Sequence, residues 1–149
     1  MGRLRKKLAM TKSATFSVAL ASIAMLASPS SAEWTEVAQS IEGDTFYIHY
    51  DSMKENKGYL YYWTLSDYLK STKGGTSSVR ALRKVDCQTP RKYQFLSYIF
   101  YDERMGSGSG NTVKETSNEW DYPTPDGVDE LLINMACDYV GRCCQSKYG

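Results

Sequence analysis

The stretch from Ser77 to Tyr101 constrains the fold of this chain more than any other segment. Its first half alternates between the two faces of a strand, which is typical of a half-buried β-strand. Gln88-Thr89-Pro90 then interrupts the pattern, because proline has no N–H to donate to a strand ladder. The stretch therefore predicts a β-hairpin with a cysteine where its first strand ends. One face carries Val79, Ala81, Val85 and Cys87, the other carries Ser78, Arg80, Lys84 and Asp86, and only Arg83 is out of pattern.

The first thirty-two residues have the layout of a secretory signal peptide. A basic head precedes the apolar run 14–27, which is too short to span a bilayer, and Ser30 and Ala32 occupy the −3 and −1 positions of a cleavage site. The alternative is an uncleaved membrane anchor, which the short run disfavours. Cleavage after Ala32 would expose Glu33 rather than the cysteine that a lipid anchor needs. We therefore expect an exported protein, periplasmic or extracellular, without a lipid anchor and without an integral membrane segment after cleavage.

Cleavage changes the charge balance of the chain. The signal segment holds five of the eighteen Lys and Arg residues and none of the seventeen Asp and Glu residues, so the remaining chain has a net charge of −4. A mildly acidic chain without a basic run has no electrostatic basis for binding nucleic acid. Residues 33–149 are enough for one domain with a core of its own.

Four cysteines lie in the exported part of the chain, where disulfides persist. Three full pairings are possible. A disulfide between the adjacent Cys143 and Cys144 has the least favourable geometry, because neighbouring Cα atoms are about 3.8 Å apart and disulfides usually span roughly 4.4–6.8 Å. We favour Cys87 with Cys137, which closes a loop of about 51 residues and contributes about 4 kcal/mol in the chain-entropy model. Cys143 and Cys144 then form a second disulfide or remain free thiols.

Alternation and turn residues predict an antiparallel β-sheet followed by a helix. From residue 128 onward the apolar residues follow helical spacing, with Asp126 as an N-cap and Gly141 as the stop after a helix ending near Val140. Six strands and one C-terminal helix form an α+β pattern, with the domain at 33–140 and a poorly ordered tail at 141–149. The expected strands are Glu33–Gln39, Thr45–Tyr50, Tyr59–Tyr68, the two arms of the hairpin and Asn111–Ser117, with connecting turns or loops at 40–44, 51–58, 69–76 and 102–110.

The sequence offers little for catalysis. His49 is the only histidine, and no local motif places it with a nucleophile. No cluster of His, Cys or carboxylate residues has metal-ligand spacing. We therefore expect a protein that is not an enzyme and holds no metal or cofactor. The alternative is a periplasmic thiol-disulfide or envelope-stress protein that uses Cys143 and Cys144, although these do not form a C-x-x-C motif.

Tyr59 to Tyr68 is the most aromatic stretch of the chain. We expect the stripe of Tyr59, Tyr61 and Trp63 to pack in the core or across strands. Tyr62 on the opposite face, and Tyr68 near the strand end, would then be exposed. Exposed tyrosines favour contacts with other proteins.

Several landmarks resemble the bacterial surface-adhesin protein E family across most of 34–137. Their order and spacing carry the resemblance more than any one motif does. They are Tyr47-Ile48 followed by Ser52-Met53, Trp63-Thr64-Leu65 with Asp67-Tyr68, Ser78 leading to Asp86-Cys87, the glycine-rich Met105-Gly106-Ser107-Gly108, and Trp120 and Pro125 before a helix that reaches Cys137.

The resemblance implies a six-stranded antiparallel sheet with the C-terminal helix tied to its concave face by a disulfide between Cys87 and Cys137. It also implies an adhesin that binds a protein, either of the host matrix or of the bacterial envelope. We expect the ligand to contact an exposed sheet edge or aromatic loop residues, and a dimer is compatible with this role. The candidate contact residues are Tyr62, Tyr68, Gly74, Gly75, Met105, Gly106 and Gly108.

Overall fold

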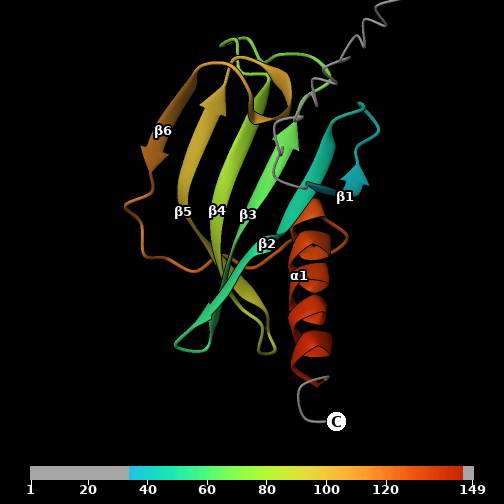
Figure 1. Cartoon of the computed structure of the whole chain (residues 1–149), viewed down its shortest axis with the longest axis vertical. Helices are drawn as coiled ribbons and strands as arrows, with labels where there is room; N and C mark the ends of the chain where they lie inside the picture. The colour runs from blue at the N-terminus through green and yellow to red at the C-terminus, as the bar shows by residue number, and fades with distance from the viewer. Residues whose placement is uncertain (1–33, 146–149) are drawn as a thin grey trace, which may run out of the picture.

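The computed structural model describes residues 34–145, with side chains up to residue 141. Six antiparallel strands follow one another in a single sheet of order β1-β2-β3-β4-β5-β6, and the helix α1 packs on one face of it (Figure 1). The expected α+β fold is therefore confirmed. The elements are β1 Thr35–Gln39, β2 Thr45–Asn56, β3 Tyr59–Asp67, β4 Ser78–Asp86, β5 Lys92–Tyr101, β6 Gly110–Lys114 and α1 Val128–Gln145, with a short 3-10 turn at Arg104–Gly106 before β6.

The main core lies between α1 and the strands β2 to β5. Leu132, Ile133 and Ala136 of the helix are almost completely buried against the sheet. From the sheet, Ile48, Leu60, Tyr62, Val85 and Tyr93 belong to the same cluster. Val79 and Ala81 are also buried, but they lie outside this cluster, so the helix covers only part of the apolar face predicted for β4.

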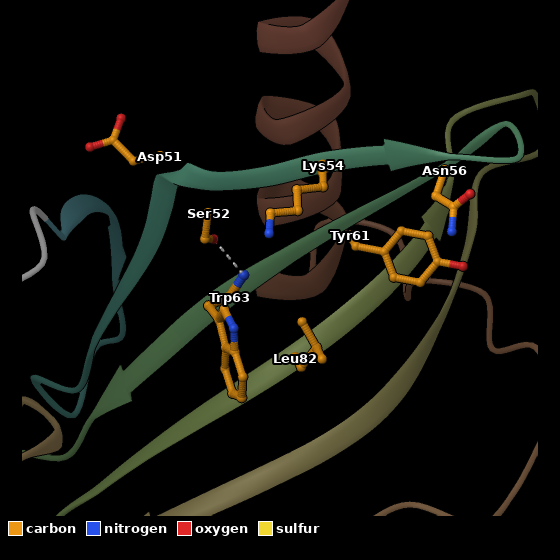
Figure 2. Close-up of a pocket in the computed structure, with 7 residues that line it drawn as sticks. All are labelled: Asp51, Ser52, Lys54, Asn56, Tyr61, Trp63 and Leu82. Carbon is orange, nitrogen blue, oxygen red and sulfur yellow. Dashed lines mark hydrogen bonds between the residues drawn. The ribbon is translucent and has the colours of Figure 1, made fainter.

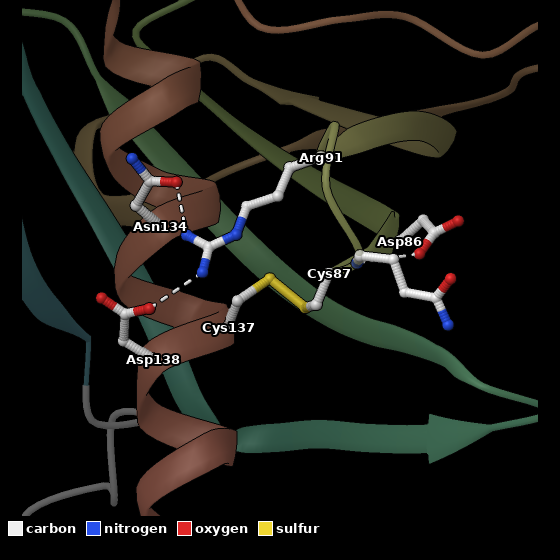
Figure 3. Close-up of a disulfide and its surroundings, with 7 residues drawn as sticks. Asp86, Cys87, Arg91, Asn134, Cys137 and Asp138 are labelled. Atoms are coloured by element: carbon white, nitrogen blue, oxygen red, sulfur yellow. Dashed lines mark hydrogen bonds and ion pairs between the residues drawn. A yellow bond between two sulfur atoms is a disulfide. The ribbon is translucent and has the colours of Figure 1, made fainter.

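The predicted disulfide between Cys87 and Cys137 is confirmed, with a Cα–Cα distance of 5.6 Å (Figure 3). Cys87 directly follows β4, and Cys137 lies in the middle of α1. Beside it, the guanidinium group of Arg91 donates hydrogen bonds to the side chains of Asn134 and Asp138. The turn between β4 and β5 is thus held to the helix by one covalent bond and by two hydrogen bonds from Arg91.

Arg83, the residue out of pattern in β4, faces the helix and is only 5% exposed. Its Nη1 lies 2.7 Å from Oδ1 of Asp129 in the first turn of α1. At this distance the two groups form an ion pair, although Nη1 makes no hydrogen bond. Nε donates to the hydroxyl of Thr64 at 3.1 Å, and the guanidinium carbon lies 4.5 Å from the ring centre of Phe95. A buried cation therefore links the sheet to the start of the helix.

Three boundary predictions are wrong. β2 continues to Asn56, where residues 51–58 were expected to form a turn, and only Lys57 and Gly58 make that turn. The helix passes through Gly141 and ends at Gln145, while the last residues of the expected tail lie outside the described part of the chain. Asp126 is not the N-cap: Gly127 precedes the helix, and the backbone N–H of Asp126 donates to the Glu130 carboxylate at 2.8 Å.

Candidate functional site

Three loops meet at one end of the sheet, the upper end in Figure 1, and we call this surface the loop end. It consists of residues 40–44, 68–77 and 102–109. The backbone N–H of Leu69 donates to the carboxylate of Asp44 at 2.9 Å, which ties the first loop to the second. The hydroxyl of Ser77 donates to the carbonyl of Asp102 at 2.7 Å, which ties the second to the third. The loops are therefore joined by direct hydrogen bonds.

A buried carboxylate anchors the third loop. The Asp67 side chain is 1% exposed and accepts hydrogen bonds from Nε and Nη2 of Arg104 at 2.9 and 2.6 Å. It also accepts one from the backbone N–H of Met105 at 2.6 Å. Hydrogen bonds between charged groups are stronger than neutral ones, and the bond to Asp67 raises the pKa of the Arg104 guanidinium. Asp67 thus fixes the loop at two neighbouring residues.

Gly106 packs where no other residue fits. It has a φ of 67°, and a Cβ on it would lie 2.3 Å from Nε of Arg80. Its N–H donates to the hydroxyl of Ser78 at 2.8 Å, and that hydroxyl donates to the carbonyl of Glu103 at 2.6 Å. Because Gly106 is buried, its role is to let the loop approach β4, and it does not form part of the contact surface.

Each of the three loops presents one exposed apolar side chain. Ile41 is completely exposed, Leu69 is 52% exposed and Met105 is 41% exposed. Tyr68 beside them is half-buried, and burial is the main cause that raises the pKa of its phenol, with a smaller contribution from Asp44. Apolar side chains on anchored loops lose little freedom when a partner covers them. The loop end is therefore suited to contact another protein.

The structure brings most of the predicted contact residues to this surface. Tyr68, Gly74, Gly75, Met105 and Gly108 all belong to the loop end, with both Gly74 and Gly75 exposed. Tyr62 was expected to be exposed, and this prediction is wrong: it is completely buried under α1. The sequence reasoning missed Ile41, Leu69, Asp67 and Arg104. Single apolar residues in the polar stretches 40–44 and 69–76 were the available signal for the first two.

The strand β6 begins beside the loop end and forms one edge of the sheet. All five of its residues are exposed, and within the described chain it pairs only with β5. The backbone N–H of Glu115 donates to the carbonyl of Leu96 on β5. Because successive residues of a strand direct their backbone groups to opposite sides, the backbone groups of Thr112 and Lys114 face away from β5. An edge of this kind can add a strand from another protein, although its shortness and Lys114 limit that tendency.

A groove lies on the sheet face opposite α1, and we call it the helix-distal groove (Figure 2). Its volume is about 560 Å³. It forms where β2 leaves β3, because pairing stops at His49 and resumes at Lys54. In the gap the Ser52 hydroxyl takes the place of the missing backbone partner. It accepts a hydrogen bond from the backbone N–H of Trp63 at 3.0 Å and donates one to the carbonyl of His49 at 2.6 Å. The lining residues are Asp51, Ser52, Lys54, Asn56, Tyr61, Trp63 and Leu82.

A smaller hollow of about 180 Å³ continues from this groove and shares Ser52 and Trp63 with it. Trp34, Arg80 and Ile99 complete its lining together with His49. Tyr61 and Trp63 were expected to pack in the core or across strands. They lie outside the core cluster and line the groove, because β3 turns its even-numbered residues toward the helix.

The side chains described between residues 34 and 141 include no group of three or more His, Cys, Asp or Glu residues placed to hold a metal ion. No helix in the described part of the chain is long and apolar enough to cross a membrane. The thiols of Cys143 and Cys144, on which the redox alternative depends, lie outside the described side chains.

Comparison with known proteins finds a matching family and solved structures with a similar fold. The family model of surface-adhesin protein E matches residues 34–138. Crystal form II of Haemophilus influenzae protein E is similar, with a TM-score of 0.56 and 17% identity over 72% of this chain and 89% of that one. Another structure of Haemophilus influenzae protein E gives a TM-score of 0.54 and 16% identity, over 73% of this chain and 86% of that one. At such identity these structures support the fold alone. No curated protein matches the chain in sequence.

Proposed function

The chain belongs to the surface-adhesin protein E family, and we propose that it is an exported, non-enzymatic module that binds another protein. The ligand is a protein of the host matrix or of the bacterial envelope. The chain reaches the periplasm or the cell exterior after cleavage behind Ala32, without a lipid anchor. In this role the domain recognises its ligand and carries out no chemistry on it.

The loop end is the contact surface in this proposal. The observation that carries it is the set of three exposed apolar side chains, Ile41, Leu69 and Met105, on loops that are joined by hydrogen bonds. A buried carboxylate anchors the loop of Met105. Protein interfaces draw most of their affinity from a few apolar anchors on a preorganised surface. The edge strand β6 borders this surface and extends the area that a partner covers.

The test is a pull-down with residues 33–149 against matrix and envelope proteins, followed by titration of the captured ligand. Leu69→Glu and Met105→Glu are expected to weaken binding at least tenfold, because each places a charge in the centre of an apolar contact. Leu131→Glu is the matched control, since Leu131 is 42% exposed but lies on α1. Equal losses in the control, or a folded protein that captures no ligand, would contradict the proposal.

A further inference from the structure

We propose that the helix-distal groove binds an acidic oligosaccharide. The rings of Tyr61 and Trp63 would cover the apolar faces of sugar rings, and Lys54 would bind the carboxylate or sulfate group. This site goes beyond the protein contact proposed for the loop end, because it lies on the face of the sheet opposite α1 and is built from other residues.

The charge that faces the groove is positive. In Figure 2 the amino group of Lys54 extends toward Ser52 and Trp63, while the carboxylate of Asp51 turns away from the other lining residues. Among the described residues no ion pair involves Lys54, whereas Lys92 is paired with Asp86. A cation without a countercharge beside two aromatic rings favours a ligand that is both anionic and partly apolar.

The same combination of rings and cations continues at both ends of the groove. At one end the guanidinium of Arg80 lies 5.4 Å from the ring centre of Trp34. At the other end Lys84, the partner of Tyr61 across the sheet, lies 4.3 Å from the ring of Tyr59. Arg80, Leu82 and Lys84 alternate on β4, so the Cα atoms of the two basic residues are about 14 Å apart. An extended ligand with repeated acidic groups fits this row better than a compact one.

The floor of the groove argues against a peptide. β3 and β4 are central strands whose main chains pair with neighbours on both sides, as in Tyr61 with Lys84 and Leu82 with Ser97. Peptides that bind sheets add to an edge strand, and neither β3 nor β4 is an edge strand of this sheet. Recognition here depends on side chains: flat rings, the amide of Asn56 and the amine of Lys54. These groups match the ring faces, hydroxyls and acidic groups of a sugar chain. The groove volume of about 560 Å³ is that of a typical ligand site.

The experiment measures tryptophan fluorescence of residues 33–149 during titration at low salt. The probes are a heparin tetrasaccharide, tetragalacturonate, neutral chitotetraose, octathymidylate and an acidic octapeptide. We expect both acidic sugars, or the sulfated one alone, to bind at least about tenfold more tightly than the other three probes. Binding to tetragalacturonate assigns the charge contact to carboxylates, and binding to heparin alone assigns it to sulfates.

Lys54→Gln is expected to reduce affinity for the acidic sugar about tenfold and to weaken its salt dependence. Lys73→Gln is the matched control, because Lys73 is an exposed lysine at the loop end. The idea fails if no sugar binds the folded protein, if chitotetraose, octathymidylate or the peptide binds as tightly as the acidic sugars, or if the two lysine variants behave alike. Met105→Glu is expected to retain sugar binding, which separates this site from the protein contact at the loop end.

Discussion

Arg83 provides the sharpest test of how the helix is held to the sheet. Replacing it by alanine removes the ion pair with Asp129 at 2.7 Å, the hydrogen bond to Thr64 and the contact with the ring of Phe95. Breaking a buried ion pair costs about 3–5 kcal/mol. Because Asp129 is 39% exposed, water can solvate the carboxylate that remains, so we expect the lower end of this range. Arg83→Ala should therefore lower the free energy of unfolding by about 3 kcal/mol, which corresponds to roughly 10–15 °C in melting temperature.

A double-mutant cycle in urea separates the pair from the packing. We expect a coupling energy between Arg83 and Asp129 of about 2 kcal/mol, since the arginine is buried. The pair of Arg91 and Asp138 is the control, with its side chains 30% and 60% exposed, and its coupling should stay below about 1 kcal/mol. Equal coupling energies in the two cycles would refute the assignment of Arg83 as the main polar link between sheet and helix.

The remaining predictions concern the disulfide, the loop anchor and alkaline pH. Cys137→Ser should lower the free energy of unfolding by about 4 kcal/mol, because the bond closes a long loop, while Cys144→Ser should hardly change it; equal melting temperatures would contradict this. Arg104→Ala should speed amide exchange in the loop 102–109 while leaving exchange in α1 unchanged, and uniform acceleration would argue against a local anchor. Burial is the main cause that raises the pKa of Tyr93 and Tyr98 to about 12. The folded state then keeps protons that the unfolded state loses, so stability measured in urea should fall between pH 10 and pH 12, and less so in Tyr98→Phe; a flat profile would refute it.

The elements that sequence reasoning predicted well are those with a single buried face. β4 alternates except at Leu82 and Arg83, and the hairpin was predicted from that alternation. The disulfide next to it was predicted from the positions of the cysteines and from the family resemblance. In β3 the same reasoning chose the wrong face. Its first five residues are all apolar or aromatic, so period-two patterning cannot tell which face meets the helix. Tyr62 was therefore expected at the surface, and Trp63 was expected to pack in the core or across strands.

Two boundaries were wrong because local signals were weaker than the surrounding structure. Residues 51–56 are polar except for Met53, and most of them are exposed to solvent on a strand that was taken for a turn. Gly141 did not end the helix, since an exposed glycine costs only about 1 kcal/mol in a helix and the chain beyond it can still form helical hydrogen bonds. At the loop end, Asp67 and Arg104 meet across 37 residues of sequence. No local pattern indicates a contact of that separation.

Strand β3 connects the core, the helix-distal groove and the loop end. Tyr62 belongs to the core, Trp63 to the helix-distal groove and Asp67 to the anchor of the loop end. Because neighbouring residues of a strand point to opposite faces, a shift of one residue in its pairing would move Trp63 into the core and Asp67 away from its partners. The bond from Trp63 to Ser52 and the bonds from Asp67 to the third loop both oppose such a shift. The disulfide, in contrast, holds the helix and touches neither surface. Loss of the disulfide should therefore reduce stability while the protein that remains folded keeps both binding surfaces.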